Sequence, residues 1–429
     1  MNSRLLRVSL LGHLSLIICV SSCGSSSDPN VGPSAGAGNS LAGSHGIAGN
    51  SGVSGGGVGG SVAGASSAGG GGISGIGGGG GGSAGVGGSG GQVFSGPCTP
   101  PNDIDKPFEK LSQTGCMSTT EKTKFAALVI PYEVNSPLWS DSADKQRGMV
   151  IPVGQTVHIK DCTVDTQSCT QGTADTGKWV FPVGTVMLKN FAFDGKLVET
   201  RLFVRHDADT WVGYSYQWDE AQSEATIVSD DRKDVMFNTG ARTVPWQYPS
   251  RIDCMKCHNA MGGSTIGPET RQMNRIVGAA NQIDHLNDLK IFDKAPAKPY
   301  AAAYVTPYAG QAGMPPADAT LETRARSYLA ANCAFCHRPD GDFFAIDMRF
   351  DKDFKDMKLC NVEPMQGNQG VIGAVNLKPG DTANSIMYLR MKAKTTDTGR
   401  MPQIGTNKID DLGLKLIGDW ITSIKTCPQ

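Results

Sequence analysis

Two copies of one short cysteine and histidine pattern constrain this chain of 429 residues more than any other feature. The first copy is Cys254-Met255-Lys256-Cys257-His258, and the second is Cys333-Ala334-Phe335-Cys336-His337. Each CxxCH copy places two thiols and an imidazole on one helical turn, so the fold must present three reactive groups together at two places. A lone CxxC also occurs in zinc sites and in thioredoxin-like redox pairs. The histidine directly after each pair, and the repetition of the whole pattern, argue against both alternatives.

Covalent attachment of haem is the chemistry that needs this arrangement. The two thiols meet the two vinyl groups of one porphyrin, and the adjacent imidazole reaches the iron from the same side. His258 and His337 are therefore the predicted proximal iron ligands, and the other ring nitrogen of each is expected to donate to a carbonyl or a carboxylate. The sequence predicts two haem c groups, bound by Cys254, Cys257, His258, Cys333, Cys336 and His337.

The last 110 or so residues contain the further signals of a haem domain. An amphipathic pattern at Leu321, Ala325, Tyr328 and Leu329 predicts a helix that runs into the second CxxCH motif, and the sequence Gly399-Arg400-Met401-Pro402 follows 64 residues after His337. Fourfold spacing of apolar residues then predicts a closing helix, at Leu412, Leu416, Trp420 and Ile424. This order resembles the class I cytochrome c domain. The resemblance implies that Met401 is the distal iron ligand and that the 407–424 helix packs across the first helix.

The first CxxCH motif has a less regular continuation. Met314, in Gly313-Met314-Pro315-Pro316, lies 56 residues after His258 and is the preferred distal ligand. Met261, Met273 and His285 stay open as alternatives, and Met314 is otherwise an ordinary loop residue. No closing helix is evident before the second unit, so this half departs from the class I pattern.

The chain has twelve cysteines. Six are left for disulfides once the four of the CxxCH motifs are set aside, together with Cys19 in the N-terminal apolar run and Cys23 just after it. Six cysteines permit fifteen pairings, among which local spacing favours Cys98 with Cys116, Cys162 with Cys169, and Cys360 with Cys427.

The region before the haem motifs has the period of β-strands. Thr185–Phe193 alternates between apolar and polar residues, Asp194-Gly195 is a hairpin turn signal, and Leu197–Val204 alternates again. Further strands are expected at 211–218 and 225–228. Short strands separated by glycine and proline predict an antiparallel β-sandwich-like domain. Arg251, directly before the first motif, is either a propionate partner or a surface charge.

The N-terminus has the three parts of a secretory signal over residues 1–22, and Val20-Ser21-Ser22-Cys23 resembles the bacterial lipobox. The resemblance implies a lipid on Cys23. Residues 23–97 are expected to form a disordered Gly/Ser-rich tether, since 29 of the 56 glycines lie between Gly32 and Gly91 and charged residues are absent from 29–102.

These features predict a multidomain α+β protein, with a β-rich domain over 98–250, a first haem segment over 251–318 and a class I-like domain over 319–429. The mostly α-helical part is the haem region. The combination resembles a family of bacterial dihaem c-type lipoproteins, which implies electron transfer between redox partner proteins, with attachment to the outer membrane through Cys23. A haem enzyme with an open first iron, similar to a dihaem peroxidase or a dehydrogenase, and a β-domain binding module are the alternatives.

The chain carries a formal net charge of -1 and no basic run after its N-terminus, so nucleic acid is not an expected partner. No small-molecule substrate is evident. Gly-rich phosphate loops, nucleophile elbows and HExxH motifs are not found in the sequence.

Overall fold

A computed structural model describes residues 97–429, except 165–166, 168, 170–175, 312–313, 315, 340, 342 and 395–396. The predicted signal peptide, the lipid site at Cys23 and nearly all of the predicted tether lie outside the described residues. Within the described part of the chain, no helix is both long enough and apolar enough to cross a membrane.

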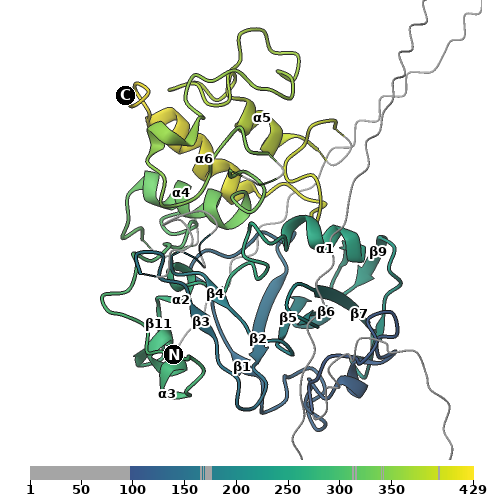
Figure 1. The fold of residues 1–429 in the computed structure, drawn as a ribbon. Coiled ribbons are helices and arrows are strands. Elements are labelled where there is room, and N and C mark those ends of the chain that lie inside the picture. Colours follow the sequence, from purple (N-terminus) through teal and green to yellow (C-terminus); the bar gives the residue numbers. More distant parts are fainter. Residues whose placement is uncertain are drawn as a thin grey trace, which may run out of the picture. The chain divides into compact units, whose positions relative to one another are not determined.

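An antiparallel sheet of six strands forms the centre of the β-rich region (Figure 1). Its strand order is β1-β2-β5-β6-β7-β8. Asp194 and Gly195 both have positive φ, as a tight hairpin turn between β5 and β6 requires, so the predicted hairpin is confirmed. The predicted strands at 185–193, 197–204, 211–218 and 225–228 are also confirmed within one or two residues. The bounds are β1 Ile130–Pro131, β2 Asp144–Val150, β5 Val186–Phe193, β6 Lys196–Arg205, β7 Trp211–Trp218 and β8 Ala225–Ile227.

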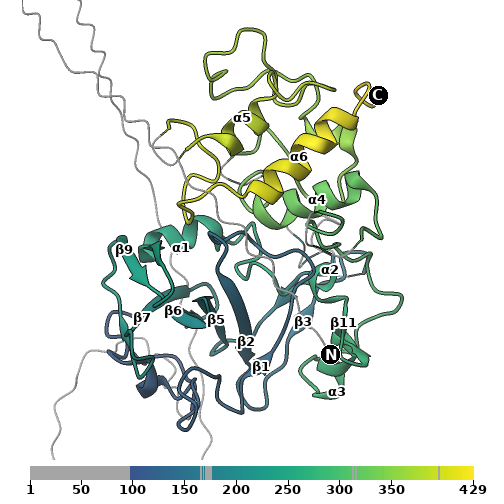
Figure 2. The same ribbon diagram turned by 180° about the vertical axis from the view of Figure 1, so that it is seen from behind.

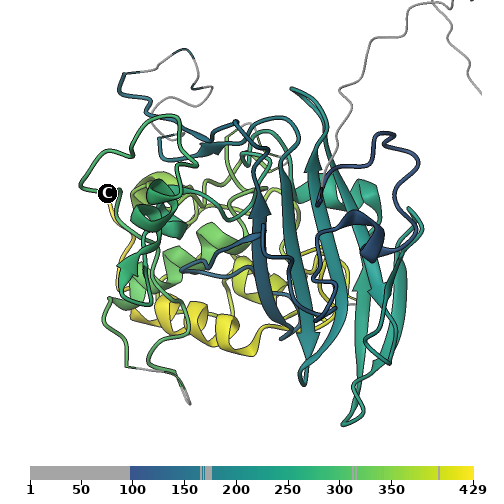
Figure 3. The same cartoon turned by 90° about the horizontal axis from the view of Figure 1, so that it is seen from below.

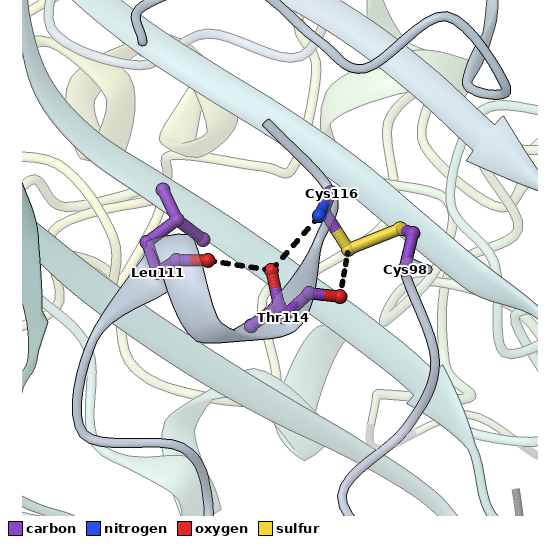
Figure 4. Close-up of a disulfide and its surroundings, with 4 residues drawn as sticks. All are labelled: Cys98, Leu111, Thr114 and Cys116. Carbon is purple, nitrogen blue, oxygen red and sulfur yellow. Dashed lines mark hydrogen bonds between the residues drawn. A yellow bond between two sulfur atoms is a disulfide. The ribbon is translucent and has the colours of Figure 1, made fainter. Parts of the chain in front are cut away.

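The two faces of this sheet pack against different layers, because successive side chains of a strand point to opposite faces. Leu188, Leu202 and Tyr216 lie in a core that also contains the Cys98–Cys116 disulfide. Figure 4 shows that disulfide beside Thr114, whose hydroxyl donates to the Leu111 carbonyl. Met187 and Phe203 belong to the other face. Figure 3, which looks at the molecule from below, shows the green and yellow helices gathered on one side of the sheet.

The remaining strands form three two-stranded sheets, so the region has one large sheet rather than the two comparable sheets of a sandwich. The pair β9–β10 packs on Phe191 and Phe193 of the main sheet through Trp246 and Tyr248. The bounds are β3 His158–Ile159, β4 Trp179–Val180, β9 Lys233–Asn238, β10 Thr243–Tyr248, β11 Ile276–Val277 and β12 Ala280–Asn281.

Short helices and longer loops make up the chain after Tyr248. The predicted helix before the second motif is α4, and the closing helix is α6. These two helices contact each other, and Leu416 and Trp420 are buried in their shared core. The region is nevertheless not mostly helical, because its helices are only 4 to 13 residues long. Their bounds are α1 Arg251–Cys257, α2 Thr270–Met273, α3 Gln282–Asp288, α4 Leu321–Asn332, α5 Ile386–Lys392 and α6 Asp411–Ser423, with 3₁₀ turns η1 Leu111–Thr114 and η4 Phe354–Met357.

All three predicted disulfides are confirmed: Cys98–Cys116, Cys162–Cys169 and Cys360–Cys427. Among the described residues, the four cysteines of the CxxCH motifs form no disulfide.

The β-rich region and the C-terminal helices contact each other closely, and the view from behind in Figure 2 shows α4, α5 and α6 above the strands. The segment between β1 and β2 makes most of the polar contacts. Ser136 donates to the Ser327 carbonyl of α4, the Trp139 amide donates to Asn332, and Asp141 accepts from the amides of Asn407 and Lys408. The regions on either side of the predicted boundary near residue 250 therefore pack against each other.

Candidate functional site

Both CxxCH motifs line one cavity, which lies between the main sheet and the C-terminal helices. The empty space between the lining atoms is about 2060 Å³, its opening to solvent included. The enclosed volume is about 280 Å³, close to the lower end of the roughly 300–1,000 Å³ of pockets that hold one small molecule. The motifs also contact each other. Asn259 donates from its side chain to the Phe335 carbonyl across 3.2 Å, and the Cys336 sulfur lies 3.7 Å from the Lys256 carbonyl oxygen.

The first motif lies on helix α1, whose N-terminus is fixed by a capping box. Ser250 caps the helix and accepts from the Asp253 amide, and the Asp253 carboxylate accepts in return from the Ser250 amide. Asp253 is buried and also accepts from Arg232 and Lys256. Burial acts to raise the pKa of Asp253, but the hydrogen bonds from Lys256, Arg232 and Ser250 outweigh it and lower the pKa to about 2.

A glycine lets helix α1 approach the sheet. Gly213 of β7 faces Cys254, and a Cβ built on Gly213 would lie 2.9 Å from the Cys254 sulfur. A contact that short is not tolerated, so only glycine at this position allows the thiol its present place.

His258 follows α1 and is held by two contacts. Its Nδ1 lies 2.7 Å from the Ser264 carbonyl oxygen, which fixes the proton on Nδ1 and leaves Nε2 unprotonated. The Phe203 ring lies 4.1 Å from the imidazole, centroid to centroid. Burial, together with Lys189, lowers the pKa of His258 to about 3. The imidazole is therefore neutral at pH 7, as an iron ligand must be.

The second motif begins where α4 ends, with Cys333 as the C-cap residue. The His337 ring stacks on Phe343 at 5.3 Å between centroids, and burial lowers the pKa of His337 to about 4. Among the described residues its Nδ1 is buried without a hydrogen-bond partner. The expected carbonyl or carboxylate partner is therefore found for His258 and not, within that part of the chain, for His337.

Met401 lines the same cavity, on a loop that two buried arginines hold in place. Arg390 donates to the Gly399 carbonyl and accepts, through its own carbonyl, from the Met401 amide. Arg400 donates to the Pro402 and Lys408 carbonyls and to the Thr406 hydroxyl. The loop therefore brings Met401 to the cavity that contains His337.

Met314 is not among the residues that line the cavity, and it is 44% exposed. The alternatives Met261, Met273 and His285 do not line it either. Met273 is buried in the core that also contains Met187 and Phe203, and Gln282 contacts its sulfur there. Sequence reasoning missed two methionines that do line the cavity, Met187 of β5 and Met391 of α5.

Two cations, Lys189 of β5 and Arg201 of β6, lie on the floor that the sheet forms below the cavity. Arg201 is paired with the fully buried carboxylate of Glu199 through two hydrogen bonds of 2.7 and 2.8 Å. Burial lowers the pKa of Lys189 well below its usual value. The sequence offered one signal for these two cations, because each is a charged residue in the middle of an otherwise apolar strand. Arg251, considered there as a propionate partner, instead pairs with Asp230 at 2.8 Å and does not line this cavity.

The donor set fits two covalently attached haems. Each motif offers two thiols that form no disulfide and a neutral imidazole, and both motifs open onto one cavity. Burial raises the pKa of the Cys257 and Cys333 thiols to about 12, so they are protonated in the chain without haem. Among the described residues, no group of three His, Cys, Asp or Glu side chains could hold a metal ion directly.

No family model, no curated protein and no solved structure matches this chain.

Proposed function

We propose that this chain is a dihaem c-type cytochrome that transfers single electrons between redox partner proteins. Cys254 and Cys257 would hold the first haem, with His258 on its iron. Cys333, Cys336 and His337 would hold the second, with Met401 as its distal ligand. The bound haems supply the one-electron redox chemistry, and the protein sets their potentials and their access to solvent.

The contact between the two CxxCH motifs carries this proposal. Cys336 lies beside Lys256 of the first motif, so thioether bonds at both sites would attach the two porphyrins next to each other in one cavity. Adjacent haems suit electron passage through a single chain from one partner to another. An arrangement for storage or for isolated sites would not require the contact.

The local order around the second motif supports a class I-like arrangement there. Helices α4 and α6 contact each other, and the Met401 loop enters the cavity between them and the sheet. The residues from 251 to about 318 form the first haem segment of the proposal, with α1 packed on β7.

We also propose that the protein works outside the cytoplasm, anchored to the outer membrane through a lipid on Cys23. The three disulfides support an oxidising compartment. The lipid, the membrane and the partner proteins rest on the sequence pattern alone.

Haem content and ligation test the proposal together. A pyridine haemochrome assay on the purified holoprotein should give two haems c per chain, and replacement of Cys333 and Cys336 by alanine should leave one. A chain that carries no covalent haem when produced with a cytochrome c maturation system would refute the function.

The alternative function is an oxidoreductase with an open first iron. One observation supports this alternative: Met314, the methionine predicted for the first iron, lies outside the cavity. Carbon monoxide decides between the two: binding to half of the reduced haem would indicate an enzyme, and no binding would indicate an electron carrier.

A further inference from the structure

Three cations lie directly opposite one another on neighbouring strands of the main sheet. Arg147 of β2 is the cross-strand partner of Lys189 of β5, and Lys189 is the partner of Arg201 of β6. Directly opposite residues share one face of a sheet, and like charges in such pairs repel each other. This face is the one whose residues Lys189 and Arg201 line the haem cavity.

The row formed by these three cations has too few carboxylates nearby to balance its positive charge. Glu199 pairs with Arg201 and also accepts from the Trp246 indole, so it is already engaged. No hydrogen bond or ion pair is found in the described chain for the side chains of Lys189 and Arg147. Both side chains are partly buried, and burial lowers the pKa of each. A partly buried cation without a carboxylate partner costs free energy, so these cations favour the binding of an anion that the chain itself does not supply.

We propose that Lys189 and Arg201, which line the cavity, form a carboxylate-binding site on its floor, with Arg147 adding positive charge beside Lys189. Arginine binds carboxylates with a planar pair of donors, and lysine adds a compact charge beside it. The carboxylate comes either from the propionates of a bound haem or from a small free carboxylate ligand. In the first case the proposal rests on the proposed function, because it requires the haem.

Two variants and one control test the site in the holoprotein. Lys189→Met keeps the length of the side chain and removes its charge, and Arg147→Gln removes the charge at the other unpaired position with a shorter polar side chain. Lys122→Met removes a charge from an exposed lysine before β1 and serves as the control. Haem content by pyridine haemochrome is measured first for every protein.

If propionates fill the site, Lys189→Met lowers the midpoint potential of one haem and leaves the other unchanged. The expected fall is about tenfold in the equilibrium constant for reduction, which is about 59 mV for one electron. Arg147→Gln should lower the same potential, and Lys122→Met should change neither.

If a free carboxylate fills the site, sodium acetate raises the thermal midpoint of the wild type in a saturable way, relative to sodium chloride at equal ionic strength. Lys189→Met removes that rise. Unchanged potentials in both variants, together with no specific effect of acetate, would overturn the proposal. The acetate measurement does not need haem, so a chain without haem would refute the proposed function and leave the acetate result to decide this site.

Discussion

The side-chain amide of Asn259, directly after the first CxxCH motif, donates a hydrogen bond to the main-chain carbonyl of Phe335 in the second motif, 76 residues further along the chain. The same side chain accepts from the Gly262 amide at 2.6 Å, which fixes the turn after His258. Asn259 thus orders the turn after His258 and connects that turn to the second motif.

Asn259→Ala should therefore weaken both the fold and the coupling between the sites. The variant loses three hydrogen bonds, since Asn259 also donates to the Lys256 carbonyl, which predicts a decrease of about 1.5–4 kcal/mol in the free energy of unfolding. In a redox titration, the separation of the two midpoint potentials should also change. Asn368→Ala removes a local bond within an exposed turn and is the matched control. Wild-type values for both measurements would show that the contact has no role.

Gly213→Ala should impair attachment of the first haem. The added Cβ would lie 2.9 Å from the Cys254 sulfur, so α1 has to move away from β7. We expect haem content to fall from two per chain towards one, with the far-red band of the second site retained. Ser215→Ala, on the same strand, adds no atoms and should keep two haems. Full haem content in Gly213→Ala would mean that α1 can shift without loss of function.

Met401→Leu should abolish the weak far-red sulfur-to-iron band of the second haem in the oxidised spectrum, because leucine offers no ligand atom. Met391→Leu is the matched control, since Met391 lines the same cavity. Met314→Leu tests the remaining sequence prediction for the first haem. The spectrum should stay unchanged, because Met314 is exposed and lies outside the cavity. If the band persists in Met401→Leu, a residue other than Met401 is the distal ligand.

Asp253→Asn should destabilise the protein in a pH-dependent way. The pKa of Asp253 is about 2 in the folded chain, against an ordinary value of 3.8, so its contribution is present above about pH 4 and is lost as the pH falls towards 2. The difference in the free energy of unfolding should be about 2 kcal/mol at pH 7. Urea unfolding of both proteins between pH 7 and pH 3 measures it. A difference that stays constant below pH 4 would contradict the assignment to this carboxylate.

Local patterns in the sequence were sufficient for several features. Period-two alternation and Asp194-Gly195 identified the β5–β6 hairpin, and apolar spacing identified α4 and α6. Close spacing also favoured Cys98 with Cys116 and Cys162 with Cys169. These features depend on residues near one another in the chain, so backbone conformation and short loops define them. The CxxCH motifs belong to the same class, because their thiols and imidazole share one turn.

Other features depended on contacts between distant segments. A sandwich and a mostly helical haem region were expected, whereas one large sheet and short helices are found. The spacing between His258 and Met314 also did not reveal that Met314 lies outside the cavity. The shared cavity brings residue 254 near residue 336, and the cation row requires the registers of β2, β5 and β6 together. Strand register and the packing of remote segments are set by the buried surface of the whole fold, and no short stretch of sequence contains that information.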